Sequence, residues 1–341
     1  MTDDRPGAML DAPLTGPACW RAADLASDTS WRHRLTDAER AEILRIARLP
    51  SPPPGPEDRR RLAPHLEARL DRVADELRRG RGLFLLTGWP IEEMNRPEIE
   101  RGYVWFGEAL GTLKSQNVAG DLIGEVMDVG QDYAIDPNAR GYMSNDELRP
   151  HSDGCDLSSL LCLRSAKSGG TTSLVSTGTI HNILRETRPD LLPLLYRGFY
   201  NDLRGYGEKG TGRETSPTRW PVFLYHEGHL SSGYNGKTIR TAPAKNRIAL
   251  SAREIEAIDL LERYAEDDAL RVDLRLAPGE LVVFSNLLTL HKRDRFEDHP
   301  EPERRRLLLR LWLNDHEPRP LPEAVATLLR GGISARRTSP A

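Results

Sequence analysis

The first part of the chain shows helical periodicity interrupted by short breaks. A helix is predicted over Asp37–Ala47, and after the proline-rich connector SPPPGPED (51–58) apolar residues recur at helical spacing over Arg59–Arg79. The second stretch is typical of a long amphipathic helix. The short apolar run LFLLTG (83–88) ends in glycine and predicts a buried strand, and a further helix is expected over Pro97–Leu110.

Beyond Gly120 the pattern changes to short β-prone segments separated by Gly, Pro, Asn and Asp. Two helical stretches interrupt them, near Thr179–Arg188 and over Ala252–Ala265. This layout favours a sandwich or barrel over a βαβ array. We therefore expect a mainly β fold with flanking helices, in which a jelly-roll (double-stranded β-helix) core is wrapped by N-terminal and inserted helices. The predicted strands cover 122–129, 157–164, 171–176, 197–203, 221–225, 230–235, 271–276, 280–285 and 304–314.

Three parts are expected along the chain. Residues 1–57 form a partly ordered N-terminal extension, in which Trp20 and Trp31 indicate some packing against the body. Residues 58–320 form a single jelly-roll domain, and 321–341 form a C-terminal tail.

Composition narrows the class of protein. Of the 341 residues, 29% are charged and 38% are hydrophobic, as in ordinary globular domains, and the formal net charge of −3 gives no reason to expect binding to nucleic acid or to an anionic membrane. Three scattered cysteines are too few for a disulfide framework or a zinc–cysteine site. No apolar run has the roughly 18 residues needed to span a bilayer, and the acidic N-terminus does not resemble a signal peptide, so a cytoplasmic location is expected.

The stretch LRPHSDGCDL (148–157) carries the first candidate chemistry. In an extended strand His151 and Asp153 lean to the same side, although an isolated pair of this kind is more often a polar turn. The segment 279–296 adds His291 soon after an apolar strand and a turn. Two histidines and one carboxylate form the facial triad of non-haem Fe(II) enzymes, which leaves three coordination positions open. Asp156 is the rival carboxylate, but its odd spacing from His151 points it away.

A strongly apolar segment near the C-terminus, RRLLLRLWL (305–313), carries arginines. Arg306 and Arg310 are four residues apart, so both face one side of a strand, about 13 Å apart. A buried arginine needs an anionic partner, and its planar fork suits a carboxylate. The alternative is that these arginines form structural pairs with glutamates or lie on the surface, which is the interpretation we favour for Arg304 and Arg305.

Together, HSD (151–153), SGGTTSLVS (168–176), His291 and RRLLLRLWL resemble the TauD/TfdA family of Fe(II)- and 2-oxoglutarate-dependent dioxygenases, over about residues 80–318. The resemblance implies that His151, Asp153 and His291 bind Fe(II). It further implies that Arg306 and Thr172 hold the distal carboxylate of 2-oxoglutarate, and that Arg310 meets an acidic group of the substrate. The interval from His291 to Arg306 is longer than the family pattern, which makes Arg310 the competing candidate for the cosubstrate clamp. Dimers and tetramers are common in the family, so a homo-oligomer is compatible with it.

The expected reaction is hydroxylation of an unactivated C–H bond of a small acidic or amino-acid-like metabolite. It would consume 2-oxoglutarate and O2 and release succinate and CO2. Asp153 argues against halogenation, because halogenases of this type have a small residue at that position. Desaturation, cyclisation and epimerisation stay open as outcomes. The alternative class is a metal-dependent jelly-roll hydrolase or a non-catalytic metal-binding protein.

Overall fold

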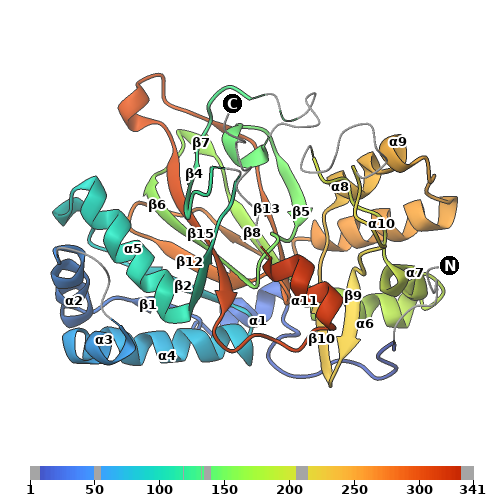
Figure 1. Cartoon of the computed structure of the whole chain (residues 1–341), viewed down its shortest axis with the longest axis horizontal. Helices are drawn as coiled ribbons and strands as arrows, with labels where there is room; N and C mark the ends of the chain where they lie inside the picture. The colour runs from blue at the N-terminus through green and yellow to red at the C-terminus, as the bar shows by residue number, and fades with distance from the viewer. Residues whose placement is uncertain are drawn as a thin grey trace, which may run out of the picture.

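A computed structural model of the chain describes residues 8–49, 55–117, 119–131, 133, 140–204 and 214–331. Two β-sheets packed face to face form its centre (Figure 1). The larger, seven-stranded sheet has the order β1 (Arg32–Arg34), β2 (Leu83–Thr87), β12 (Leu281–Ser285), β6 (Leu157–Arg164), β15 (Leu307–Asp315) and β3 (Gly111–Lys114), with β4 (Ile123–Val126) also pairing β15. The smaller sheet has the order β11 (Arg271–Leu274), β8 (Thr172–Ser176), β13 (Thr289–Arg293) and β5 (Leu148–His151). Apart from the parallel pair β1–β2, these strands pair antiparallel, as the predicted jelly roll requires.

Apolar side chains of the larger sheet point alternately to its two faces and so contribute to two separate apolar layers. Leu309 and Leu311 of β15 pack in the layer under the N-terminal helices, whereas Leu308 packs in the layer between the sheets. Because side chains alternate along a strand, Arg306 and Arg310 share the side of Leu308. The predicted strand at 304–314 thus supplies interior arginines, although it begins only at Leu307, after the short 3-10 helix η3 (Pro302–Arg304).

The N-terminal helices cover the outer face of the larger sheet (Figure 1). They are α2 (Asp37–Ala47), α3 (Pro56–Leu62), α4 (Pro64–Arg78) and α5 (Arg96–Leu110), preceded by the short α1 (Ala22–Ser27). The prediction of one helix over 59–79 is wrong, because the helix breaks at Ala63 (φ −141°, ψ 59°). Pro64 causes the break, since proline disfavours a helical conformation in the residue before it. Residues 51–54 of the proline-rich connector lie outside the described residues.

The segments predicted as an extension and a tail both contain packed structure. Trp20 and Trp31 are buried, as expected, and β1 adds an edge strand to the larger sheet. Near the other end, residues 323–330 form helix α11 (Glu323–Arg330), whereas 332–341 lie outside the described residues.

A second group of helices lies on the side of the smaller sheet (Figure 1). It comprises α6 (Thr177–Thr187), α7 (Leu192–Arg197), α8 (Gly236–Thr241), α9 (Pro243–Asn246) and α10 (Ala252–Ala265), beside the hairpin β9 (Phe223–His226) and β10 (His229–Ser232). The strand predicted over 197–203 is wrong: the backbone there makes only isolated bridges, between Phe199 and Trp220 and between Asp202 and Thr215. The pair β7 (Ser168–Gly169) and β14 (Phe296–Glu297) completes the described strands.

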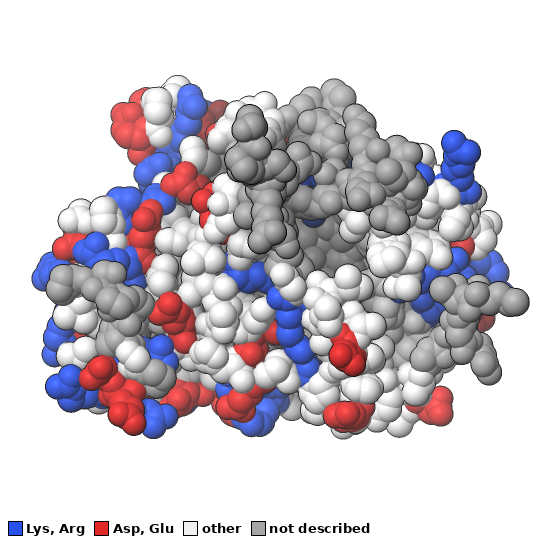
Figure 2. Space-filling model, in the orientation of Figure 1, with Lys and Arg blue, Asp and Glu red and all other residues white. Residues whose placement is uncertain are grey.

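Positive and negative side chains are intermingled over the N-terminal helices on the face shown in Figure 2. This mixture agrees with the near-neutral formal charge of −3. None of the helices within the described ranges is long and apolar enough to cross a bilayer.

Candidate metal centre

The three predicted metal ligands meet where the edge strand β5 of the smaller sheet pairs with β13. His151 ends β5 and lies opposite His291 of the neighbouring antiparallel strand β13, with ring centroids 4.2 Å apart. Asp153 follows β5 by two residues, and one ligand atom from each of the three residues lies within 4.8 Å of the others. The sequence placed His291 after a strand and a turn; the structure places it within a further strand, and this pairing is what brings the two histidines together.

Hydrogen bonds fix the carboxylate of Asp153. Its Oδ2 accepts from Ser158 Oγ at 2.8 Å and from Trp312 Nε1 at 2.9 Å, and its backbone N–H donates to Asn286 Oδ1 at 2.9 Å. Burial opposes ionisation of this group, but the nearby Arg310 and the hydrogen bond from Ser158 contribute to holding the pKa of Asp153 well below its usual range. The carboxylate is therefore ionised and oriented, as a metal ligand must be.

Both histidines are held in the neutral form that binds a metal. Burial lowers the pKa of His291 to about 3 and also lowers the pKa of His151. His151 Nδ1 lies 2.8 Å from the carbonyl oxygen of Arg149, which leaves Nε2 free to face an ion. His291 Nε2 lies 3.8 Å from Asp153 Oδ2. This donor set of two imidazoles and one carboxylate fits Fe(II).

The rival carboxylate, Asp156, is committed elsewhere. It is 2% exposed, and its Oδ2 lies 3.0 Å from Arg330 Nε and accepts from the backbone N–H of Asp315 at 3.1 Å. The prediction that Asp156 points away from the metal centre is confirmed.

Arg306 lies in the interior, next to the glycine pair that precedes Thr172. Its side chain is buried, its guanidinium carbon lies 5.0 Å from the Phe296 ring centroid, and Nη1 makes a 3.4 Å contact with the carbonyl oxygen of Val126. A Cβ at Gly170, where φ is +72°, would lie 3.2 Å from Arg306 Nε, so a side chain there would crowd the guanidinium. Burial lowers the pKa of Arg306 to about 10.

A second buried arginine, Arg293, was not found from the sequence. It follows His291 by two residues on β13, on the same side of the strand, and it is the cross-strand partner of Thr172. Its Nη2 donates to the carbonyl oxygen of Ser144 at 2.8 Å and also bonds that of Asp146. Its Nε and Nη1 are buried without a hydrogen-bond partner. Burial, and to a lesser extent repulsion from Arg306, lowers the pKa of Arg293 to about 9. The spacing from His291 was the signal that could have revealed it.

Arg310 lies beside the predicted metal ligands, away from Arg293 and Arg306, which both lie against the Phe296 ring. Its Nε donates to Gln116 Oε1 at 2.7 Å, and its Nη1 lies 3.7 Å from Asp153 Oδ1. Its guanidinium is flanked by the rings of Tyr142 and Trp312, at 4.7 and 4.8 Å from their centroids. The contributions of Gln116 and Trp312 were also missed. Gln116 is 194 residues from Arg310 in sequence, whereas Trp312 lies two residues after Arg310 on β15, and that spacing was the signal that could have revealed it.

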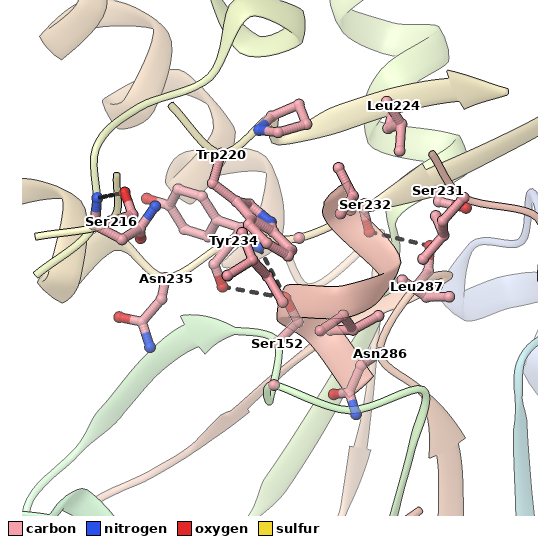
Figure 3. Close-up of a pocket in the computed structure, with 18 of the residues that line it drawn as sticks. Ser152, Ser216, Trp220, Leu224, Ser231, Ser232, Tyr234, Asn235, Asn286 and Leu287 are labelled. Atoms are coloured by element: carbon pink, nitrogen blue, oxygen red, sulfur yellow. Dashed lines mark hydrogen bonds between the residues drawn. The ribbon is translucent and has the colours of Figure 1, made fainter. Parts of the chain in front are cut away.

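Two cavities adjoin these residues. The smaller one, of about 100 Å³, is polar and contains the metal ligands His151 and Asp153; we call it the polar cavity. It is also lined by Gln116, Tyr133, Arg140, Tyr142, Arg204, Arg310 and Trp312. The larger one, of about 280 Å³, is mainly apolar and lies beside Ser152, Asp153 and Gly154 (Figure 3); we call it the apolar cavity.

Comparison with known proteins agrees with this geometry. Residues 48–312 match the family described as "Taurine catabolism dioxygenase TauD, TfdA family". FR-33289 synthase from Streptomyces rubellomurinus is 32% identical over 327 residues, covering 94% of this chain and 95% of that protein.

Solved structures share the fold. An asparagine oxygenase in complex with Fe(II), 2S,3S-3-hydroxyasparagine and succinate superposes with a TM-score of 0.64 at 18% identity, over 83% of this chain and 93% of that one. The non-haem iron oxygenase OrfP in complex with Fe and α-ketoglutaric acid gives a TM-score of 0.59 at 15% identity, over 83% and 94% of the two chains. The chain therefore belongs to the TauD/TfdA family and is an Fe(II)- and 2-oxoglutarate-dependent non-haem iron oxygenase.

Proposed function

We propose that this oxygenase hydroxylates an unactivated C–H bond of a small acidic, amino-acid-like metabolite. The observation that carries the proposal is the convergence of His151, Asp153 and His291 in a cavity that also presents Arg310. Hydroxylated asparagine and hydroxylated arginine are named in structures that share this fold, which supports an amino-acid-like substrate.

In this proposal His151, Asp153 and His291 bind Fe(II). When bound, the iron would activate O2, which is the oxidant for 2-oxoglutarate decarboxylation and C–H hydroxylation. The protein contributes orientation: Ser158 and Trp312 hold the Asp153 carboxylate, and the carbonyl of Arg149 holds the ring of His151. Three protein ligands would leave coordination positions for the cosubstrate and O2.

Arg306 and Thr172 bind the distal carboxylate of 2-oxoglutarate in this proposal, and Arg293 shares that role. Among the described residues no carboxylate lies within 4.0 Å of the Arg306 or Arg293 guanidinium, although both are buried beside Phe296. A buried cation without a counterion is costly, so two neighbouring ones favour an anionic ligand between them. Arg310, by contrast, already faces Asp153 and Gln116, which makes Arg306 the better clamp.

Arg310 is left to bind the acidic group of the substrate. It faces the polar cavity, which Arg140 and Arg204 also line. Asp153 is the one carboxylate among the described residues that line this cavity, and it is assigned to the metal. The lining thus favours an acid placed close to the iron. A hydrolytic metal site would leave the buried pair Arg293 and Arg306 without a purpose.

The test is anaerobic addition of Fe(II) and 2-oxoglutarate to the full chain. The proposal predicts a visible metal-to-ligand charge-transfer band, followed by succinate release when O2 is admitted. Acidic metabolites that perturb the band and couple succinate release to a mass gain of one oxygen atom would identify the substrate. Absence of the band in the wild-type protein would overturn the proposal.

A further inference from the structure

The apolar cavity is enclosed by segments far apart in sequence (Figure 3). One wall comes from the β9–β10 hairpin and the segment before it, including Trp220 and Leu224, and Leu287 closes another side. The remaining wall is α11, through Val325, Leu328 and Leu329. The segment expected to be a tail therefore shapes the cavity next to the metal centre.

This cavity is continuous in its lining with the polar cavity. Ser152, Asp153 and Gly154 line both, as does Asn235. The backbone at this junction is fixed, because the Ser152 N–H donates to the Tyr234 carbonyl oxygen and the Tyr234 N–H donates to Ser152 Oγ, both at 2.8 Å. The two cavities therefore lie side by side, with these shared residues at their boundary.

Helix α11 is held in place by polar contacts close to the metal ligands. Arg330 Nε lies 3.0 Å from Asp156 Oδ2, and Asp156 follows the ligand Asp153 by only three residues. Asn314 Nδ2 donates to the Arg330 carbonyl oxygen at 2.9 Å, and Lys114 Nζ bonds the carbonyl oxygens of both Leu329 and Gly154. These contacts connect the position of α11 to the metal-binding segment.

The lining sets the chemistry of the occupant. Asp153 is the one charged side chain among the described residues that line the cavity, so a charged group would be buried there without a partner at high cost. Ser232 Oγ and Ser216 Oγ already donate to carbonyl oxygens, at 3.2 and 2.8 Å. Ser231 Oγ is buried and has no hydrogen-bond partner. The cavity thus suits an uncharged, mainly apolar group.

We propose that the substrate is bipartite: its acidic end lies at Arg310, and an uncharged, mainly apolar portion occupies the cavity walled by α11. Helix α11 is then a specificity-determining element, selecting the length of the apolar portion. This inference rests on the proposed function, because it takes the polar cavity as the site of the acid.

The test uses straight-chain carboxylic acids as probes. Acetate, butanoate and hexanoate are titrated anaerobically into the full chain saturated with Fe(II) and 2-oxoglutarate, and the perturbation of the charge-transfer band gives each affinity. Burial of each added methylene group is expected to tighten binding about fourfold. Val325→Trp narrows the cavity and should weaken this dependence on chain length, while the acetate affinity and the band itself stay as in the wild type. Arg330→Met removes the ion pair that holds α11, so it should reduce the gain in affinity for each added methylene group.

Thr327→Trp is the matched control, since Thr327 lies on the same helix, is exposed and does not line the cavity. It should behave as the wild type. An affinity that does not depend on chain length, failure of hexanoate to bind, or an equal loss for all acids in Val325→Trp would overturn the inference. Failure of the band to form in the wild type, before any probe is added, would instead overturn the proposed function.

Discussion

Arg293 and Arg306 lie against the same aromatic ring. Each guanidinium carbon is 5.0 Å from the Phe296 ring centroid, and each side chain is no more than 4% exposed. The two arginines come from different sheets, one from β13 and the other from the residue that precedes β15. Two buried like charges this close favour a shared anionic ligand, and the distal carboxylate of 2-oxoglutarate has the required charge and shape.

Replacing Arg306 with Gln should weaken 2-oxoglutarate binding at least about 30-fold, because a buried charge pair costs several kcal/mol when one partner is removed. Metal binding should be retained. Anaerobic titration of the charge-transfer band measures both. Arg305→Gln, a change at the exposed neighbouring position, should leave the affinity unaltered. If Arg306→Gln binds 2-oxoglutarate with the wild-type affinity, a different residue binds the distal carboxylate.

Arg293→Met should weaken 2-oxoglutarate but affect 2-oxopentanoate much less, because 2-oxopentanoate has a methyl group in place of the distal carboxylate. Arg293 also bonds the carbonyl oxygen of Ser144, so its loss could alter the local structure. That structural effect would weaken the binding of both ligands equally. If Arg293 contacts the distal carboxylate, the substitution should instead lower the affinity for 2-oxoglutarate relative to the affinity for 2-oxopentanoate. Calorimetric titration of both ligands into the metal-loaded protein gives the ratio of the two affinities. An unchanged ratio would rule out the contact.

Ser158→Ala should lower the affinity for Fe(II) about 10-fold or more, because it removes a hydrogen bond that orients the Asp153 carboxylate. Ser159→Ala is the matched control: it is the next residue of β6, and its hydroxyl faces the opposite side, where Tyr103 donates to it at 2.9 Å. Competition with a chromophoric chelator measures the affinity. Equal effects of the two changes would show that loss of strand stability, and not orientation of the carboxylate, is responsible.

Asp153→Asn and Asp156→Asn should separate the metal ligand from its neighbour. The first should abolish tight Fe(II) binding. The second should retain the metal but loosen α11, because Asp156 pairs with Arg330, and it should lower the free energy of unfolding by roughly 1–3 kcal/mol. Metal titration and urea unfolding measure the two properties, and limited proteolysis should cut Asp156→Asn faster near α11. Loss of the metal in Asp156→Asn would contradict this assignment.

The metal-free protein should become less stable as the pH falls from 7 to 5. Burial lowers the pKa of His181 from its usual value of about 6.5 to about 4, and lowers the pKa of His291 to about 3. A histidine with a depressed folded-state pKa binds a proton more readily when unfolded, so stability is lost as the pH falls below about 6.5. For His181 alone the loss is roughly 1–2 kcal/mol over this range.

Urea unfolding in the presence of a chelator, at a series of pH values, measures this loss. His181→Phe should reduce the dependence on pH, since the phenyl ring cannot take up a proton, whereas His291 still contributes. If the curves of the wild type and the variant run parallel, burial of a neutral His181 does not contribute.

Local sequence pattern determined much of this protein. Strand β6 and helices α2 and α10 begin and end where the periodicity predicted, because each has a continuous apolar face that must be buried. The facial triad was also predictable, since His151 and Asp153 are close in sequence and His291 follows an apolar strand. Residue types and spacing therefore indicated both the jelly roll and its iron chemistry.

Tertiary structure decided what local pattern could not encode. Arg293 looks like one of many arginines in the sequence, and only the pairing of β13 with β8 and the approach of β15 place it beside Thr172 and Arg306. Helix α11 is amphipathic, but its position over the apolar cavity depends on Asp156 and Lys114, more than 170 residues earlier. Periodicity states which face of an element is buried, whereas the partner of that face is chosen by contacts between residues far apart in the chain. The residues proposed to bind the metal could thus be found by reading the sequence, while the walls proposed to select a substrate became visible only in the folded protein.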